Sequence, residues 1–317
     1  MNSAQFKNVA AALAALEARV NAFLPSRYQH CYSSVSPNSM GSAELEYGPD
    51  GKVAWNQIWT TFCDLALAGG PPHRGKLLEP VTGADVAANL GCYRDVVAEI
   101  ERAIGLAVGL PVVDGYAPGW VGVKCGSPVE AAWLQFAVTA ENVSARRRVA
   151  VLQLPAGPAF RIEKEIKNVV VALAKAFHYW DGHLTAVQQH LAGEGVWEAA
   201  TPDEAAKNPA EYEAAVVEVE TGLREAGVSP MPSRYPGWVG VQMADEEEAV
   251  WLLRAVLAEQ VLARREEAAL YFPVNATLRA SHAARVRRAF GHAWQLWTLL
   301  RQAAATSGEG PIVADQL

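Results

Sequence analysis

Hydrophobic and polar positions follow one another in the same order twice along this chain. Each time, a helical segment rich in Ala, Leu, Val and Glu leads through Pro and Gly into a short apolar run typical of a strand. A second helix, a second apolar run ended by Pro and a last helix follow. The expected segments are 93–108, 120–125, 149–154 and 160–179 in one unit, and 212–226, 238–243, 268–272 and 281–300 in the other. The pattern predicts an α-β-α-β-α unit and favours an α/β or α+β fold.

The same two units also share residues at a fixed offset. The hexapeptide Pro-Gly-Trp-Val-Gly-Val begins at Pro118 and again 118 residues later at Pro236, and Trp133 meets Trp251 at that offset. Trp55, within Ala-Trp-x-Gln, matches the Ala-Trp-x-Gln around Trp133, which indicates a more diverged first copy. We therefore predict three tandem α-β-α-β(-α) repeats in a pseudo-threefold arrangement, with a single twisted sheet as the alternative. The three tryptophans are expected at equivalent buried positions.

The repeats set the expected domain boundaries. Repeat 1 covers 1–92 and includes a long loop at 29–42, whose Ser, Pro, Asn and Gly residues favour turns. Repeat 2 covers 93–191 and repeat 3 covers 211–317. The segment 192–210, with interspersed Gly, Pro and acidic residues, is interpreted as a linker and as the preferred point of proteolysis.

Composition narrows the class of protein without naming a reaction. Of 317 residues, 51% are hydrophobic and 19% are charged, which is typical of a folded protein and excludes a disordered chain. The net charge of −7 argues against nucleic acid as a partner. Charged residues, Gly and Pro interrupt every apolar stretch, which argues against a membrane span or signal peptide. The four cysteines form no Cys-x-x-Cys pair, so we expect a cytoplasmic protein with reduced thiols.

The loop Gly-Gly-Pro-Pro-His-Arg-Gly-Lys at 69–76 carries the most informative local chemistry. Its prolines restrict the backbone, and His73 and Arg74 follow them directly. Such a loop can hold a carboxylate or phosphate with preorganised hydrogen bonds. The GxxxxGK spacing within it resembles a P-loop, but Leu77 stands where a P-loop has Ser or Thr, and two prolines lack the N–H groups of a phosphate cradle. We therefore expect an anion site in which Arg74 binds the ligand.

Cationic residues recur at the equivalent place in the other copies, at 146–148 and 264–265. Polar residues precede them on the expected helices, including Asp64 and Asn142. One interpretation is that Asp64, Asn142, Arg146 and Arg148 line a ligand cleft. The alternative is structural, because arginines near a helix C-terminus complement its dipole and buried polar groups require hydrogen-bond partners.

A stripe on the helix 160–179 supplies the candidate catalytic groups. Glu163, Lys167 and His178 lie on one face at about 100° per residue, and with His73 they could perform acid and base chemistry. The alternative is a solvated face with a Glu–Lys pair. No metal site is predicted, because His178 and His183 are about 140° apart on an ideal helix and cannot share an ion there.

The leading functional hypothesis is a protein that binds a small anionic metabolite in a cleft between repeats, with or without transforming it. The divergence of the first copy, which alone has the Pro-Pro-His-Arg-Gly loop, motivates a single asymmetric site. The alternative is a non-catalytic scaffold or assembly subunit that contacts protein partners, or further copies of itself, through Trp-rich and Arg-rich faces. The sequence identifies no cofactor, substrate or reaction.

Overall fold

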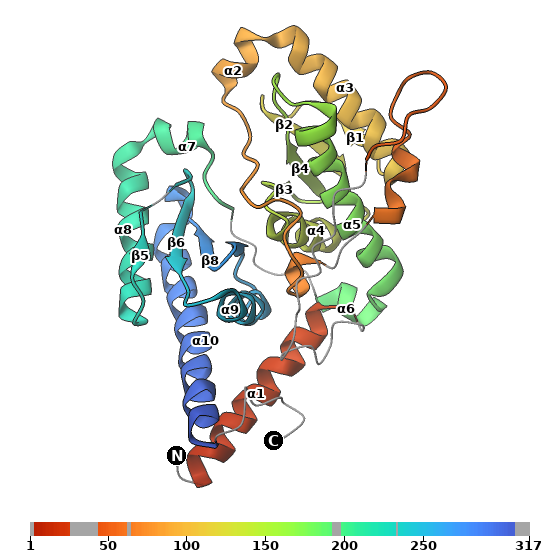
Figure 1. The fold of residues 1–317 in the computed structure, drawn as a ribbon. Helices are drawn as coiled ribbons and strands as arrows, with labels where there is room; N and C mark the ends of the chain where they lie inside the picture. Colours follow the sequence, from red (N-terminus) through yellow and green to blue (C-terminus); the bar gives the residue numbers. More distant parts are fainter. Residues whose placement is uncertain (1–2, 26–43, 62–64, 192–197, 233, 308–317) are drawn as a thin grey trace. The chain divides into compact units, whose positions relative to one another are not determined.

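A computed structural model describes residues 3–25, 44–61, 65–191, 198–232 and 234–307. The chain divides into two compact units. Unit 1 comprises Met1–Ser36, Gly195–Ala200 and Glu204–Leu317, and unit 2 comprises Pro37–Glu194 and Thr201–Asp203. Both combine helices with a small antiparallel sheet, so the mixed α+β class expected from the sequence is confirmed (Figure 1).

Unit 2 is built around a four-stranded antiparallel sheet in the order β1-β2-β4-β3. Helix α3 packs against β1 and β2, and α4 packs against β3 and β4. Its strands are β1 (Val112–Val113), β2 (Trp120–Lys124), β3 (Arg146–Arg148) and β4 (Val151–Pro155). Its helical elements are η2 (Trp55–Thr61), η3 (Ala66–Ala68), α2 (Gly83–Ala88), α3 (Leu90–Ala107), α4 (Pro128–Ala140), the π-helix η4 (Ile162–Ile166), α5 (Lys167–His183) and α6 (Ala186–Leu191).

Unit 1 has the corresponding sheet order, β5-β6-β8-β7. Its strands are β5 (Pro230–Met231), β6 (Trp238–Gln242), β7 (Arg264–Glu266) and β8 (Ala269–Pro273). Its helical elements are α1 (Ser3–Phe23), α8 (Pro209–Glu225), α9 (Glu246–Ala258), η5 (Ala276–Leu278) and α10 (Arg279–Ser307). A short helix, α7 (Pro202–Lys207), crosses the boundary between the units.

The strands and the helix between them recur 118 residues apart, from β1 to β4 in unit 2 and from β5 to β8 in unit 1. The local devices that shape these elements recur too. Ser127 and Asp245 cap α4 and α9 by accepting a hydrogen bond from the backbone N–H three residues on. Asn142 and Gln260 follow the two helices with φ of 60° and 59°, a left-handed turn that sends the chain back toward the sheet.

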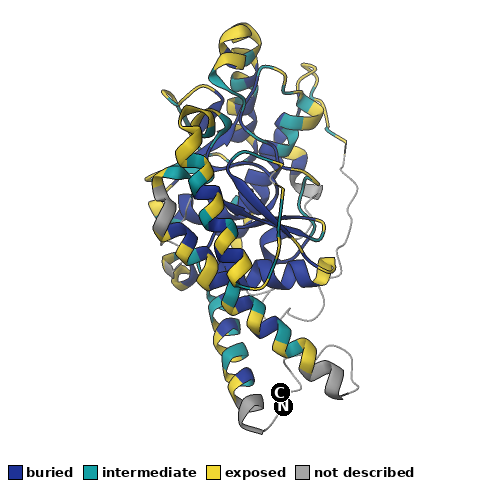
Figure 2. Cartoon of the chain, turned by 90° about the vertical axis from the view of Figure 1, so that its left-hand side faces the viewer, coloured by how far each residue is buried: buried dark blue, intermediate teal, exposed yellow. Residues whose placement is uncertain are grey.

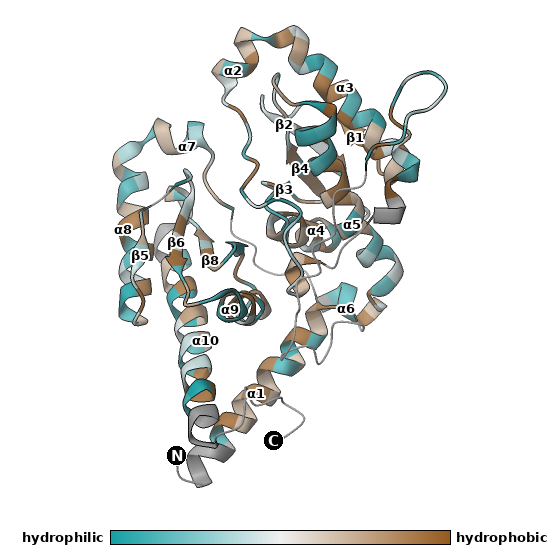
Figure 3. Ribbon diagram, viewed as in Figure 1, coloured by the Kyte–Doolittle hydropathy of each residue, from teal (hydrophilic) through white to brown (hydrophobic). Residues whose placement is uncertain are grey.

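The hydrophobic core of each unit lies in the sheet and the helices that pack on it. Buried residues make up most of the strands β2, β4, β6 and β8 and of the helices α4 and α9 (Figure 2), and Figure 3 shows α3 alternating between hydrophilic and hydrophobic residues, as a helix with one packed face does. Trp133 is fully buried beside Trp180, with ring centroids 5.9 Å apart, and Trp251 packs on Trp297 at 5.2 Å. These aromatic pairs join α4 to α5 in unit 2 and α9 to α10 in unit 1.

The described part of the first expected repeat has a different organisation. Tyr47 and Leu78 take part in isolated β-bridges, and the described residues after Trp55 form the 3-10 turns η2 and η3. Trp55 is fully buried, but its indole N–H donates to Glu99 at 2.7 Å, whereas Trp133 packs against another tryptophan. The pseudo-threefold arrangement is therefore not confirmed.

One further expectation needs correction. The arginines at 146–148 and 264–265 were expected in turns after a helix, but they lie in the strands β3 and β7, where three consecutive charged side chains conceal the usual apolar signal of a strand. The described part of the segment 192–210, interpreted as a linker, contains α7 and the start of α8. No helix among the described residues is both long and apolar enough to cross a membrane.

Candidate functional site

The carboxylate of Glu141, at the C-terminal end of α4, organises the candidate site in unit 2. Its Oε1 accepts a hydrogen bond from the Ala66 backbone N–H at 2.9 Å and lies 2.8 Å from the Lys175 ammonium. Its Oε2 accepts from the His73 backbone N–H at 2.8 Å. The side chains of Glu141 and Lys175 have no exposed surface. The buried negative charge is thus compensated by one cation and two backbone donors.

The segment after His73 is held by hydrogen bonds along the turn that follows α4. The Arg74 backbone N–H donates to the Glu141 carbonyl at 3.3 Å, and the Asn142 side-chain amide donates to the Arg74 carbonyl at 2.8 Å. Further along, the Leu78 backbone N–H donates to the Asn142 carbonyl at 2.8 Å, and the Ser144 backbone N–H donates to the Leu78 carbonyl at 3.0 Å. The loop expected to hold a ligand carboxylate therefore holds the carboxylate of Glu141 with its His73 N–H.

The imidazole of His73 is kept neutral by its surroundings. Burial lowers the pKa of His73 to about 4; Glu141 opposes this shift, and the positive charges of Lys175, Lys167 and Arg74 add to it. The ring nitrogen Nε2 is buried and has no hydrogen-bond partner. An unpartnered buried nitrogen is costly, and a neutral imidazole can either donate or accept a hydrogen bond there.

Arg74 is the part-exposed cation of this loop. Its Nε donates to the Lys76 carbonyl at 3.1 Å, and Lys76 itself is exposed. Within the described part of the chain, no carboxylate lies within 4 Å of the Arg74 guanidinium. The terminal nitrogens of the guanidinium fork are therefore available to an anion that approaches from solvent.

The structure brings some of the predicted residues together and separates others. His73, Arg74 and Asn142 meet around Glu141, and Lys167 is close enough to lower the pKa of His73. Glu163 is in the exposed π-helical turn before α5 and accepts a hydrogen bond from the Tyr47 hydroxyl at 2.9 Å. His178 is eleven residues after Lys167 on α5, which is about 16 Å along a helix axis. Glu163, Lys167 and His178 therefore do not form one catalytic group.

The remaining predicted residues have other surroundings. The Arg146 guanidinium lies over the Trp120 ring, 5.7 Å from its centroid, and Arg148 is exposed on β3. Arg264, the equivalent of Arg146 in unit 1, is fully buried, pairs with Glu266 at 2.7 Å and lies over three aromatic rings. This arrangement favours structural roles for Arg146 and Arg264 on their sheets. Asp64 and the loop at 29–42 lie outside the described residues.

Lys175 was not among the site residues predicted from the sequence, although its surroundings in the sequence carry a signal. It stands within the apolar run Val-Val-Val-Ala-Leu-Ala-Lys-Ala, where a lysine requires a buried partner. The equivalent carboxylate in unit 1, Glu259, meets different groups: Arg19 of α1 at 2.7 Å and His292 of α10 at 3.6 Å. Those three side chains are 29 to 52% exposed, so the fully buried form of the pair belongs to unit 2.

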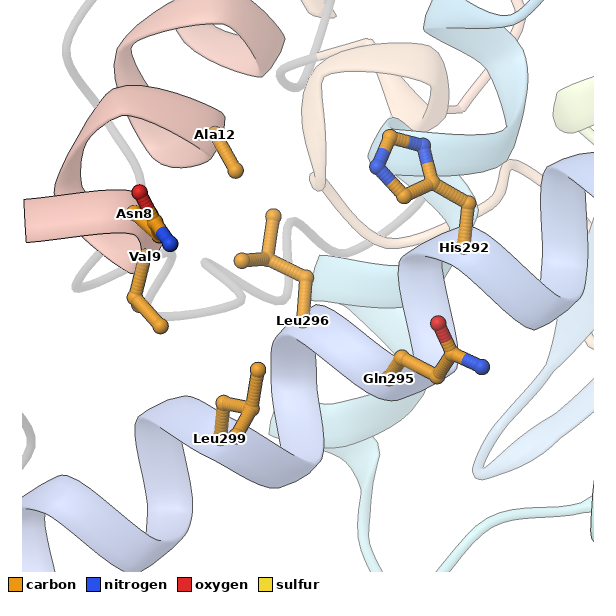
Figure 4. Close-up of a pocket in the computed structure, with 7 residues that line it drawn as sticks. All are labelled: Asn8, Val9, Ala12, His292, Gln295, Leu296 and Leu299. Atoms are coloured by element: carbon orange, nitrogen blue, oxygen red, sulfur yellow. The ribbon is translucent and has the colours of Figure 1, made fainter. Parts of the chain in front are cut away.

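Unit 1 contains a groove where α1 and α10 diverge (Figure 4). Its volume is about 260 Å³. Val9 and Leu296 are buried in its wall, whereas Leu299 is 36% exposed. The groove carries no Asp, Glu, Lys or Arg. The lining residues are Asn8, Val9, Ala12, His292, Gln295, Leu296 and Leu299.

Comparison with known proteins adds no family to this description. The chain matches no model of a protein family, and a search of curated proteins finds no relative of it.

Proposed function

We propose that unit 2 binds a small anionic ligand, a carboxylate or a phosphate, at Arg74 and His73. The observation that carries the proposal is a guanidinium with available terminal nitrogens next to an imidazole nitrogen that has no partner. A ligand oxygen bound to the Arg74 fork could also satisfy His73 Nε2 after a small movement of the loop side chains. Backbone hydrogen bonds to Glu141 and Asn142 hold this loop, so its binding groups are preorganised.

The charge around His73 supports an anion over a cation. Lys175, Lys167 and Arg74 all act on the imidazole as positive charges, and Glu141 is the one negative charge among the groups that shift its pKa. Glu141 is already compensated by Lys175 and two backbone N–H groups. Lys167 and Arg74 then remain as the positive charges that act on the imidazole, with Glu44 near Lys167 and Glu165 near Arg74, and a positive charge attracts a carboxylate or phosphate.

The test is calorimetric titration of the full chain with inorganic phosphate and, separately, with succinate. Arg74→Lys keeps the charge but removes the planar fork, so we expect binding of one probe to weaken about 5- to 100-fold, the scale of a charged hydrogen bond. The melting temperature of the ligand-free protein should barely change. Arg148→Lys, an equally conservative change at an exposed arginine, is the matched control. A loss of ligand-free stability with unchanged affinity would assign Arg74 a structural role instead.

A second candidate function, self-assembly, is favoured by the groove between α1 and α10. Its lining is free of charged side chains and includes the exposed Leu299, which suits a hydrophobic occupant. We propose a second copy of the chain, whose own α1 and α10 would present the same uncharged surface in a symmetric dimer. Light scattering should then show a dimer for the parent chain and a monomer for Leu299→Asp. A monomeric parent chain at 100 μM would exclude this candidate.

A further inference from the structure

The last turn of α5 brings two histidines face to face. The Nε2 atoms of His178 and His183 are 3.2 Å apart, and the ring centroids are 4.9 Å apart. An ideal helix would separate these positions by about 140°. Here the turn is closed by the Leu184 N–H donating to the Tyr179 carbonyl, five residues back instead of four. This wider turn and the long side chains let both imidazoles point to one place, contrary to the expectation from the sequence.

Two features favour a cation at this place. Both histidines are exposed, so an ion can reach them from solvent, and the C-terminal end of a helix carries the negative end of its dipole. The Tyr179 ring, itself buried, lies 5.6 Å from the His178 ring and 5.1 Å from the His183 ring. Packing against a fixed aromatic ring limits the motion of both imidazoles and so preorganises their nitrogens.

The nitrogen separation fits a shared metal ion. Two imidazole nitrogens bound to one zinc ion at about 2.0–2.1 Å would lie about 3.3 Å apart at the tetrahedral angle. We propose that His178 and His183 form a two-histidine site for a divalent transition-metal ion, with zinc and copper as the class that imidazole suits. Groups of three or more metal-ligating side chains are absent from the described residues. Water completes the coordination, and the ion exchanges readily.

The site would join the two ends of the last turn of α5 and thereby stabilise it against fraying. Metal binding requires a lone pair on both Nε2 atoms, so both protons must reside on Nδ1. Without metal, one Nε2–H donates to the other Nε2, which explains the same short separation in the ligand-free chain. Burial and the neighbouring His183 lower the pKa of His178, and Asp181, on the same turn, opposes that shift.

The test is calorimetric titration of the full chain, free of any histidine tag, with Zn²⁺ alone at pH 7.5. We expect one ion per chain. His178→Ala and His183→Ala should each weaken binding by about tenfold or more, since even groups that only support a ligand contribute on that scale. His190→Ala, on α6 and exposed, is the matched control and should bind as the parent chain does.

A second measurement distinguishes the proposed pair from other surface sites. Copper bound to the parent chain should show, by electron paramagnetic resonance, coupling to two imidazole nitrogens, and each single variant should lose one of them. Both variants change exposed side chains and should fold normally, which circular dichroism checks. The proposal is overturned if the parent chain binds zinc no more tightly than the double variant. It is also overturned if His190→Ala alone abolishes binding.

Discussion

The Glu141–Lys175 pair is the residue-scale feature on which unit 2 depends most. Both charges are fully buried, so each has lost its hydration; Lys175 pairs with Glu141, and the Glu141 carboxylate also accepts hydrogen bonds from two backbone N–H groups. Replacing both by apolar groups would be tolerated better than removing one, because a lone buried charge has no compensation. The pair also fixes the 65–74 segment against α4 and α5.

Glu141→Gln should therefore destabilise the chain by about 3–5 kcal/mol, the cost of removing one charge of a buried ion pair. The free energy of unfolding in urea measures it. The matched control is Glu259→Gln in unit 1, where the ion pair with Arg19 is part-exposed and a change of about 0–1 kcal/mol is expected. If both variants lost the same free energy of unfolding, burial of the Glu141–Lys175 pair would not be the cause of the effect. Adding Lys175→Met to Glu141→Gln should recover part of the lost stability.

Two histidines with a lowered pKa, the half-buried His73 in unit 2 and the buried His282 in unit 1, make stability depend on pH. Burial is the main cause that lowers the pKa of both His73 and His282 from 6.5 to about 4. Above pH 6.5 both are neutral in the folded and unfolded chain and contribute no pH dependence. Between pH 6.5 and 4 the unfolded chain takes up protons that the folded chain does not, so stability falls with falling pH.

Each histidine is expected to lower the free energy of unfolding by at most about 1.4 kcal/mol per pH unit. Between pH 6.5 and 4 this amounts to roughly 2–3 kcal/mol for each histidine. Urea unfolding of the parent chain and of His73→Gln, measured from pH 4.5 to 7.5, isolates this contribution from that of the carboxylates. The difference between the two free energies of unfolding should shift in favour of the variant as pH falls below 6.5. Parallel curves for the two proteins would show that His73 titrates normally in the folded chain.

At the scale of elements, the entry into the second strand of each sheet depends on glycine. Gly119 and Gly237 have φ of 89° and 79°, in the left-handed region, and their N–H groups donate to the hydroxyls of Tyr93 and Tyr212. A Cβ on Gly119 would lie 2.5 Å from the Val81 carbonyl oxygen, and one on Gly237 would meet the Ala200 backbone. The repeated Pro-Gly-Trp sequence thus provides a close approach between two backbone segments.

Gly119→Ala and Gly237→Ala should each cost about 2 kcal/mol or more, from left-handed strain and the collision with backbone. The control is Gly105→Ala within α3, where a Cβ would meet nothing within 4 Å. That change should stabilise the chain by up to about 1 kcal/mol, because alanine loses less backbone entropy in a helix. The urea midpoint of each variant gives the comparison. Tolerance of alanine at Gly119 would mean that the Val81 segment moves aside easily.

At the scale of the whole molecule, each unit has its own sheet and its own tryptophan pair, so damage to one core should stay local. Trp133→Ala should speed amide hydrogen exchange in 120–155 and leave 238–273 unchanged, and Trp251→Ala should do the reverse. Hydrogen exchange followed by mass spectrometry measures both segments in one experiment. Equal acceleration in both segments after either change would show instead that the chain unfolds as one cooperative body.

The sequence by itself determined the order of most helices and strands in the two later units. The reason is that periodic apolar positions, Pro-Gly punctuation and caps such as Ser127 act over a few residues and leave a visible local pattern. The strands at 120–124 and 238–242 were predictable in this way. The charged strands β3 and β7 were not, because Arg146 and Arg264 are held by aromatic rings from other strands, a contact that no local pattern reveals.

Only the tertiary structure decided what the polar residues do. The sequence indicated His73, Arg74 and Asn142 as candidates, but their meeting point, Glu141 with Lys175, joins positions far apart in the chain. The residues from Glu163 to His178 were expected on one helical face, but they are too far apart along the helix axis to act together. His178 and His183 meet because one wider turn overrides the ideal helical angle. Angles along an ideal helix follow from sequence, whereas distances between side chains depend on how each turn closes and which segments pack together.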